Sequence, residues 1–184
     1  LPSPVKFRPK LSRRVFRRFL RVVRIAHALT VFLTLGLVSG TARSDVNAAL
    51  EAMDALSYER AFELFLESAD AGDPAAQYYV ATLYDEGRGV EQNGAHAATW
   101  FFRAARAGDS RAQTRLGTMY VRGDGLHVNV QEGARWLRAA AQGGDTEAAF
   151  LFAELHADGH GIDANSTVAL TWYKRAAANG HATA

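Results

Sequence analysis

The spacing of apolar residues after Asp73 predicts two helices separated by a glycine turn. In the run AAQYYVATLYDE (residues 75–86), apolar side chains recur at steps of three and four residues, which is the period of one helix face. Asp73 suits the N-cap of this helix, and Gly87 suits the left-handed residue that ends it. A second helix is expected to begin after Asn93, another good N-cap, and to end at Gly108.

The same pattern recurs at a step of 36 residues, with no insertion in the register. A period of this length is typical of helical repeat arrays, in which stacked hairpins bury one continuous core. The glycine pair in GRGV (residues 87–90) resembles a phosphate-binding loop when read alone, but its recurrence favours a turn between two helices. The step links the turn glycines, the capping asparagines, all three tryptophans and the paired alanines: Gly87, Gly123 and Gly159; Gly89, Gly125 and Gly161; Asn93, Asn129 and Asn165; Trp100, Trp136 and Trp172; Ala104, Ala140 and Ala176; and Ala105, Ala141 and Ala177.

This pattern resembles the Sel-one-like repeat family, a relative of the tetratricopeptide repeats (TPRs), whose members share the skeleton A…L-G…Y..G.GV…W(Y)..AA..G. The resemblance implies an all-α fold, a right-handed α/α solenoid of TPR-like hairpins with three full repeats after an N-terminal helical cap. We therefore expect the cap at 45–73, repeats at 74–109, 110–145 and 146–181, and the start of a fourth repeat at 182–184. The segments that carry the resemblance are AAQYYVATLYDEGRGVEQNGAHAATWFFRAARAG, RAQTRLGTMYVRGDGLHVNVQEGARWLRAAAQGG and EAAFLFAELHADGHGIDANSTVALTWYKRAAANG.

On the first helix of each repeat, the positions outside the shared skeleton are free to specify a partner. In a solenoid these helices line the concave side, and positions at i, i+3 and i+7 fall on one helix face. The residues there are mixed in charge and include an aromatic and an aliphatic side chain, so we expect them to bind a protein or peptide segment. The alternative is a solvated face without a specific partner. The predicted strip comprises Tyr79, Thr82, Glu86, Arg115, Thr118, Arg122, Leu151, Glu154 and Asp158.

Charge is divided unevenly along the chain. Residues 1–44 carry ten of the 21 Lys and Arg and no Asp or Glu, so the remaining residues are net negative. The pI of about 9.1 therefore reflects the leader and does not indicate nucleic-acid binding by the repeats. The chain contains no Cys, which excludes a disulfide framework and a thiolate metal site.

Residues 1–44 have the pattern of a secretory signal peptide. A basic region precedes an apolar run at 25–38, and the small residues SGTARS follow. We expect cleavage after Ala42 or Ser44 and a periplasmic or secreted protein. The motif SRRVFRR resembles the twin-arginine export signal but departs from it at Arg17, which favours the general secretory route. The alternative is an uncleaved leader that anchors the protein in the inner membrane as its only membrane contact, although the run is short for a span.

The sequence predicts no catalytic, cofactor-binding or metal site. The glycine pairs lack the Lys-Ser/Thr of a phosphate-binding loop and follow a helix rather than a strand. His156 and His160 lie four residues apart, but Gly159 should end the helix between them, so we interpret His156 as a packed residue in place of the usual Tyr. Some cysteine-rich secreted family members are linked to penicillin binding or hydrolysis, and a penicillin-binding or β-lactamase-like enzyme is the alternative function. Residues 45–184 contain no Cys, no S-x-x-K and no K-T-G motif to support it.

Exported members of the family typically act as adaptors or regulators in envelope signalling, polysaccharide export or host interaction. The resemblance therefore implies a non-enzymatic scaffold or adaptor of the bacterial cell envelope that binds a protein or peptide and needs no cofactor. The last repeat has no capping helix after it, so Trp172 and Tyr173 would be only partly covered. Either the chain is a fragment of a longer protein, or a partner or a second copy of the chain covers that end.

Overall fold

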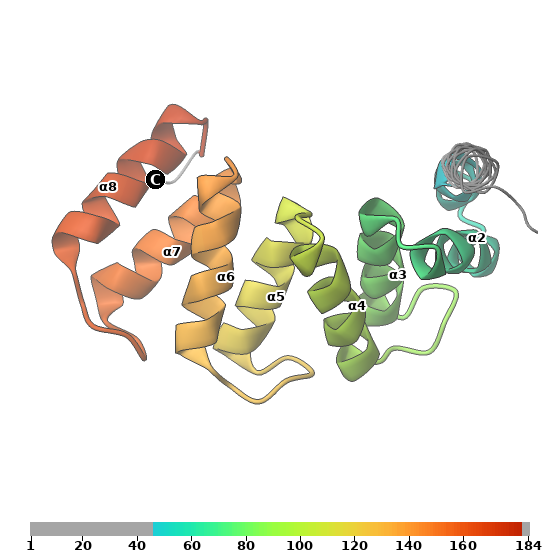
Figure 1. The fold of residues 1–184 in the computed structure, drawn as a ribbon, viewed down its shortest axis with the longest axis horizontal. Coiled ribbons are helices and arrows are strands. Elements are labelled where there is room, and N and C mark those ends of the chain that lie inside the picture. The colour runs from blue at the N-terminus through green and yellow to red at the C-terminus, as the bar shows by residue number, and fades with distance from the viewer. Residues whose placement is uncertain (1–45, 182–184) are drawn as a thin grey trace, which may run out of the picture. The chain divides into compact units, whose positions relative to one another are not determined.

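The computed structural model describes residues 46–181, and all the regular secondary structure in that part of the chain is helical (Figure 1). The predicted signal peptide and the start of a fourth repeat lie outside the described residues. The all-α fold of helical hairpins expected from the repeat is confirmed. Residues 46–54 are helical, and they are followed by α2 (Tyr58–Asp70), α3 (Pro74–Glu86), α4 (Gly94–Arg106), α5 (Ser110–Arg122), α6 (Val130–Gln142), α7 (Thr146–Asp158) and α8 (Ser166–Ala178).

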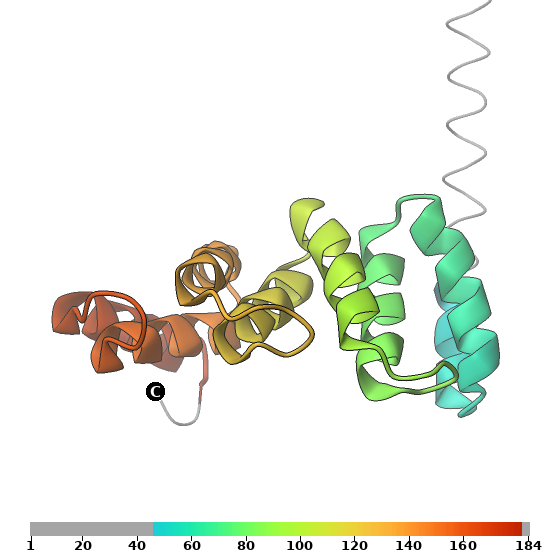
Figure 2. The same cartoon turned by 90° about the horizontal axis from the view of Figure 1, so that it is seen from below.

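Each 36-residue repeat forms one antiparallel hairpin, and successive hairpins stack side by side (Figures 1 and 2). The hairpins are α3–α4, α5–α6 and α7–α8, so α3, α5 and α7 are the first helices and α4, α6 and α8 the second. Upstream, the helical residues 46–54 pack against α2, where Ala49, Ala61 and Phe65 are fully buried in one cluster. The N-terminal hairpin expected from the register of residues 54–73 is therefore present.

Every first helix begins at a capping aspartate, and every second helix begins at a capping asparagine. A side-chain oxygen accepts one of the backbone N–H groups that the first turn leaves without a helical partner. At the three aspartates this bond measures 2.8–3.0 Å, and at the three asparagines it measures 3.0 Å. The caps are Asp73, Asp109 and Asp145 for α3, α5 and α7, and Asn93, Asn129 and Asn165 for α4, α6 and α8.

The second glycine of each turn contacts the neighbouring hairpin. A Cβ atom added to Gly125 would lie 2.3 Å from the carbonyl carbon of Gly94, the first residue of α4. One added to Gly89 would lie 2.3 Å from the carbonyl carbon of Tyr58 at the start of α2. Real Cβ contacts are never this short, so only glycine allows the turn to approach the previous hairpin. The glycine pairs of the sequence are therefore turn and packing residues, as predicted.

The hydrophobic core is shared between repeats rather than divided among them. One cluster joins Ala98 and Phe101 of α4 to Leu116 of α5. Trp100 packs against this cluster and against the preceding one, so it fills the space between two hairpins. Each repeat buries its apolar face only when its neighbours are present, which is the general condition for stability in helical repeat proteins.

Candidate protein-binding face

The nine residues of the predicted strip all lie on α3, α5 and α7, and each is half-buried or exposed. The structure places them in two different environments. Four of them, on α3 and in the middle of α5, contact other side chains or the backbone. The other five line one cavity between α5 and α7, namely Thr118, Arg122, Leu151, Glu154 and Asp158.

Tyr79 is held in place by an aromatic and cationic cluster. Its ring stacks on Phe65 of α2, with 4.7 Å between the ring centres. The guanidinium of Arg111 lies 5.4 Å from the centre of this ring and 4.3 Å from that of Tyr78. Arg111 also donates to Asp109, which raises the pKa of Arg111 above its ordinary value. Arg111 was not predicted from the sequence, because its contact depends on how α5 sits against α3.

The remaining three residues of the first group also have partners. The hydroxyl of Thr82 donates to a backbone carbonyl one turn earlier at 3.0 Å. Glu86 pairs with Arg88 in the following turn at 3.2 Å. Arg115 of α5 forms an ion pair with Asp85 of α3, so it joins the first helices of repeats one and two. The charges at this junction therefore largely satisfy one another.

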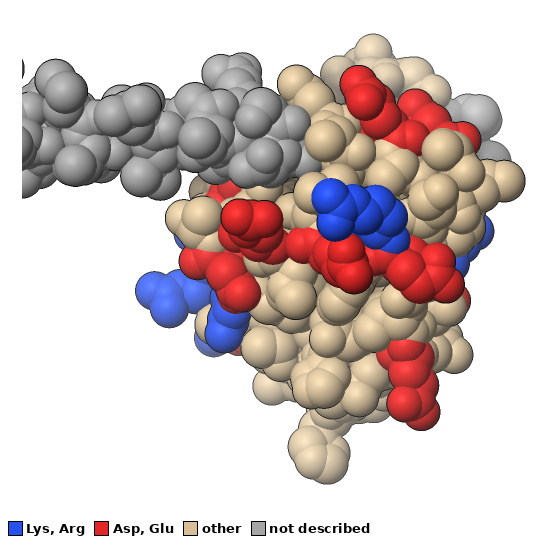
Figure 3. Space-filling model, turned by 90° about the vertical axis from the view of Figure 1, so that its right-hand side faces the viewer, with Lys and Arg blue, Asp and Glu red and all other residues tan. Residues whose placement is uncertain are grey.

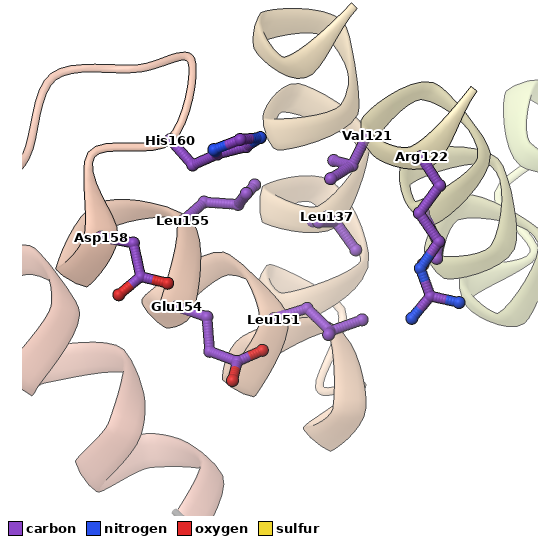
Figure 4. Close-up of a pocket in the computed structure, with 9 residues that line it drawn as sticks. Val121, Arg122, Leu137, Leu151, Glu154, Leu155, Asp158 and His160 are labelled. Atoms are coloured by element: carbon purple, nitrogen blue, oxygen red, sulfur yellow. The ribbon is translucent and has the colours of Figure 1, made fainter. Parts of the chain in front are cut away.

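The junction between α5 and α7 is different, because it holds a cavity of about 230 Å³. Val121 of α5, Leu137 of α6 and Leu155 of α7 supply an apolar wall, together with Leu151. Figure 4 shows these side chains facing one another across the cavity. His160, in the turn after α7, closes one side.

The 36-residue register explains why the two junctions differ. Asp85 corresponds to Val121, and Arg115 corresponds to Leu151. An ion pair between repeats one and two is therefore replaced by two apolar side chains between repeats two and three, and both of these line the cavity. The substitution removes two charged groups from the junction and leaves an apolar surface in their place.

Two glycines lie where α5 and α6 pack against each other next to the cavity. Gly117 and Gly133 stand where the other repeats carry alanine. A Cβ atom on Gly117 would lie 2.8 Å from Cγ of Leu137, and one on Gly133 would lie 2.7 Å from Cγ2 of Val121. Leu137 and Val121 both line the cavity, so the close packing of α5 and α6 determines the position of its apolar wall.

Charged groups on opposite sides of the cavity mouth are unpaired. The carboxylates of Glu154 and Asp158 lie on the α7 side, and the guanidinium of Arg122 lies on the α5 side (Figure 4). Within residues 46–181 none of the three forms an ion pair. Burial, followed by the negative charges of Glu154 and Asp158, raises the pKa of Tyr173 on the neighbouring α8. The α7 side of the mouth is therefore a region of negative potential.

Sequence reasoning missed four of the residues that line this cavity. Val121, Leu137 and Leu155 were not among the predicted binding residues, and His160 was considered only together with His156 as a possible metal-binding pair. The available signal was the register itself, since Val121 and Leu151 break the charged pattern set by Asp85 and Arg115. The residues of α5 that face α7 depend on the rotation of α5 about its own axis. The sequence does not specify this rotation closely enough to tell one residue from the next.

The histidines within residues 46–181 do not gather into a metal site. The ring of His156 packs edge-on against Phe152, with 4.7 Å between ring centres, which agrees with a packed residue in place of Tyr. His160 points into the cavity. In the described part of the chain, no group of three or more His, Cys, Asp or Glu side chains is arranged to hold a metal ion.

The N-terminal end of the described repeats is acidic. Glu59, Glu63 and Glu67 recur at one-turn intervals along α2 and are exposed. Figure 3 shows Asp and Glu side chains in a band across this end, with Lys or Arg side chains among and beside them. Arg60 pairs with Glu63 at 3.0 Å.

None of the helices within residues 46–181 combines the length and apolar character needed to cross a membrane.

Comparisons with known proteins agree with the repeat seen in the structure. The family model described as Sel1 repeat matches residues 54–73, 74–109, 110–145 and 146–181. No curated protein sequence matches the chain.

Solved structures of repeat proteins are similar to it, among them the following two. A Sel1 repeat protein from Oxalobacter formigenes is 35% identical, with a TM-score of 0.69 over 74% of this chain and 55% of that one. A protective antigen of uropathogenic Escherichia coli strains, which displays an SLR fold, is 26% identical, with a TM-score of 0.74 over 77% of this chain and 31% of that one. The chain thus spans about half and about a third of the lengths of these two proteins.

Proposed function

Because this chain belongs to the Sel1 repeat family, we propose that it is a non-enzymatic scaffold that binds a segment of another protein. The Sel1 repeat is a scaffold typical of protein-interaction modules. The observation that carries the proposal is the cavity between α5 and α7, where the half-buried Val121 and Leu151 lie beside unpaired charges on the face of the first helices. If this face had no partner, we would expect paired or flexible charged side chains at these positions instead of apolar ones.

We further infer that the protein acts in the bacterial cell envelope. The support is the signal-peptide pattern of residues 1–44, with its basic region, apolar run and small residues. Cell fractionation with N-terminal sequencing of the mature protein tests this location. A chain that starts after Ala42 or Ser44 in the periplasm or the medium supports export. A full-length chain in the membrane fraction supports the anchored alternative, and a full-length chain in the cytoplasm contradicts both.

Affinity capture from an envelope extract tests the binding role. We expect the immobilised chain to retain a defined protein, and we expect charge reversal at Arg122, Glu154 and Asp158 to release it. Retention of no protein, combined with turnover of a penicillin analogue by the purified chain, would overturn the scaffold proposal in favour of the enzyme. No feature of the described residues favours that enzyme.

We also propose that the C-terminal repeat self-associates through α8. Leu170 is 54% exposed, whereas Ala98 and Ala134 at the same position of the earlier repeats are 3% and 7% exposed because the following hairpin covers them. Sedimentation over a range of concentrations should show dimers that Leu170→Glu converts to monomers. A chain that is monomeric at all concentrations, with or without that change, refutes the proposal.

A further inference from the structure

The cavity between α5 and α7 is lined in a way that selects one kind of side chain. This open cavity of about 230 Å³ is lined on its apolar side by Val121, Leu137, Leu151 and Leu155, with His160 at one side. An apolar cavity of about 150 Å³ is large enough to hold benzene. The cavity therefore has room for one aromatic side chain, and its apolar wall provides the surface that such a side chain would bury.

The charges at the mouth add a second requirement. Glu154 and Asp158 lie together on the α7 side with no cationic partner among residues 46–181. A Lys or Arg of a bound segment would complement them. Residues 45–184 are also net negative, so a cationic segment is attracted at long range as well.

Arg122 on the opposite side is suited to cover an aromatic ring. Elsewhere in this protein the guanidinium groups of Arg103, Arg111 and Arg175 lie 4.3–5.0 Å from aromatic ring centres. Among the described residues Arg122 has neither an ion pair nor such a ring contact. A ring that enters the cavity beside it would supply this missing cation–π partner.

We propose that the cavity binds a partner segment in which an aromatic residue is the neighbour of a Lys or Arg. The aromatic side chain fills the cavity under Arg122, and the cation pairs with Glu154 and Asp158. The inference rests on the proposed function, since it names the chemistry of the segment that the binding face accepts. The junction between α3 and α5 is not expected to bind such a segment, because Asp85 and Arg115 pair with each other there.

Methyl NMR on the full chain tests the proposal, because Val121, Leu137, Leu151 and Leu155 all carry methyl groups. The probe is the blocked peptide Gly-Ser-Trp-Lys-Ser-Gly. We expect it to shift these four sets of methyl signals in a saturable way. Exchange of the peptide Lys for Glu should weaken binding roughly three- to tenfold, and exchange of the Trp for Ala should weaken it roughly tenfold or more.

A double variant designed from the first junction provides the decisive comparison. Val121→Asp with Leu151→Arg rebuilds the ion pair of Asp85 and Arg115 inside the cavity, and we expect it to abolish the methyl shifts. The matched control, Asp85→Arg with Arg115→Asp, reverses the pair at the other junction and should leave binding unchanged. A second variant, Glu154→Gln with Asp158→Asn, changes only the mouth of the cavity.

Each outcome decides the matter. If Val121→Asp with Leu151→Arg fails to fold, the variant of Glu154 and Asp158 still tests the inference, because it should bind the Lys and Glu peptides equally. Unshifted methyl groups at high peptide concentration, or an unchanged preference for Lys in that variant, overturn the inference. A protein captured equally by the parent chain and by the folded Val121→Asp, Leu151→Arg variant overturns it too, but leaves the proposed function standing.

Discussion

The contact between each glycine turn and the preceding hairpin can be measured with two alanine substitutions. Gly125 and Gly144 both have a left-handed backbone, with φ of +72° and +97°. A Cβ atom on Gly144 would meet nothing within 4 Å, whereas one on Gly125 would lie 2.3 Å from the carbonyl carbon and 2.4 Å from the carbonyl oxygen of Gly94. The two substitutions therefore share the backbone cost, and only Gly125→Ala also forces two hairpins apart.

The expected magnitudes follow from these distances. The left-handed conformation costs an alanine about 1–2 kcal/mol. An atom forced into a packed contact adds about 1–3 kcal/mol. We therefore expect Gly144→Ala to lower the free energy of unfolding by about 1–2 kcal/mol and Gly125→Ala to lower it by about 2–5 kcal/mol.

Urea unfolding followed by far-UV circular dichroism measures the difference. Both variants should unfold at lower urea than the parent chain, and Gly125→Ala should have the lower midpoint of the two. Equal midpoints for the two variants would refute the reasoning, because the turn would then not carry a contact between repeats. If the free energy of unfolding depended less steeply on urea concentration for Gly125→Ala alone, the hairpins of that variant would be uncoupled and would unfold separately.

Three further predictions concern the capping, interhelical and ionisable groups. Gln113→Ala removes the bond from its Nε2 atom to the carbonyl of Ala105, which measures 3.1 Å, and should cost about 1 kcal/mol in urea unfolding. Asn129→Ala removes the cap of α6 and should also cost about 1 kcal/mol, whereas Asn129→Asp should retain most of the stability. The pKa of Tyr173 is raised in the folded chain. The contribution of the neutral Tyr173 side chain to folding stability is therefore fully present below its ordinary pKa near 10, and it is lost as the pH rises through the folded pKa. Spectrophotometric titration should show that Glu154→Gln lowers this pKa, and an unchanged titration would contradict the placement of the carboxylate.

Much of the fold could be predicted because each boundary is specified locally. A capping Asp or Asn begins each helix, and a glycine with positive φ ends each first helix, so the residue types alone place the ends of α3 to within one residue. The period of 36 residues then repeats the same information at α5 and α7. Tertiary packing did not override these signals, because each hairpin buries the same face against its neighbours.

The candidate site could be predicted only in part. The strip was drawn along Tyr79, Thr82 and Glu86 and their equivalents, which assumes one fixed rotation for every first helix. The structure shows that Asp85 and its equivalent Val121 also face the next repeat. Their side chains decide whether a junction closes with an ion pair or opens as a cavity. The close approach of α5 and α6 at Gly117 also shapes the cavity. It could not be predicted from the sequence, because it depends on the positions of both helices.

The central claim is that the cavity between α5 and α7 is the binding site for a partner protein. The most direct test is the dissociation constant of the captured partner for the parent chain and for the folded Val121→Asp, Leu151→Arg variant, with Asp85→Arg, Arg115→Asp as the control. We expect binding to weaken roughly tenfold or more in the first variant and to remain unchanged in the control. Equal dissociation constants for all three chains would contradict the claim.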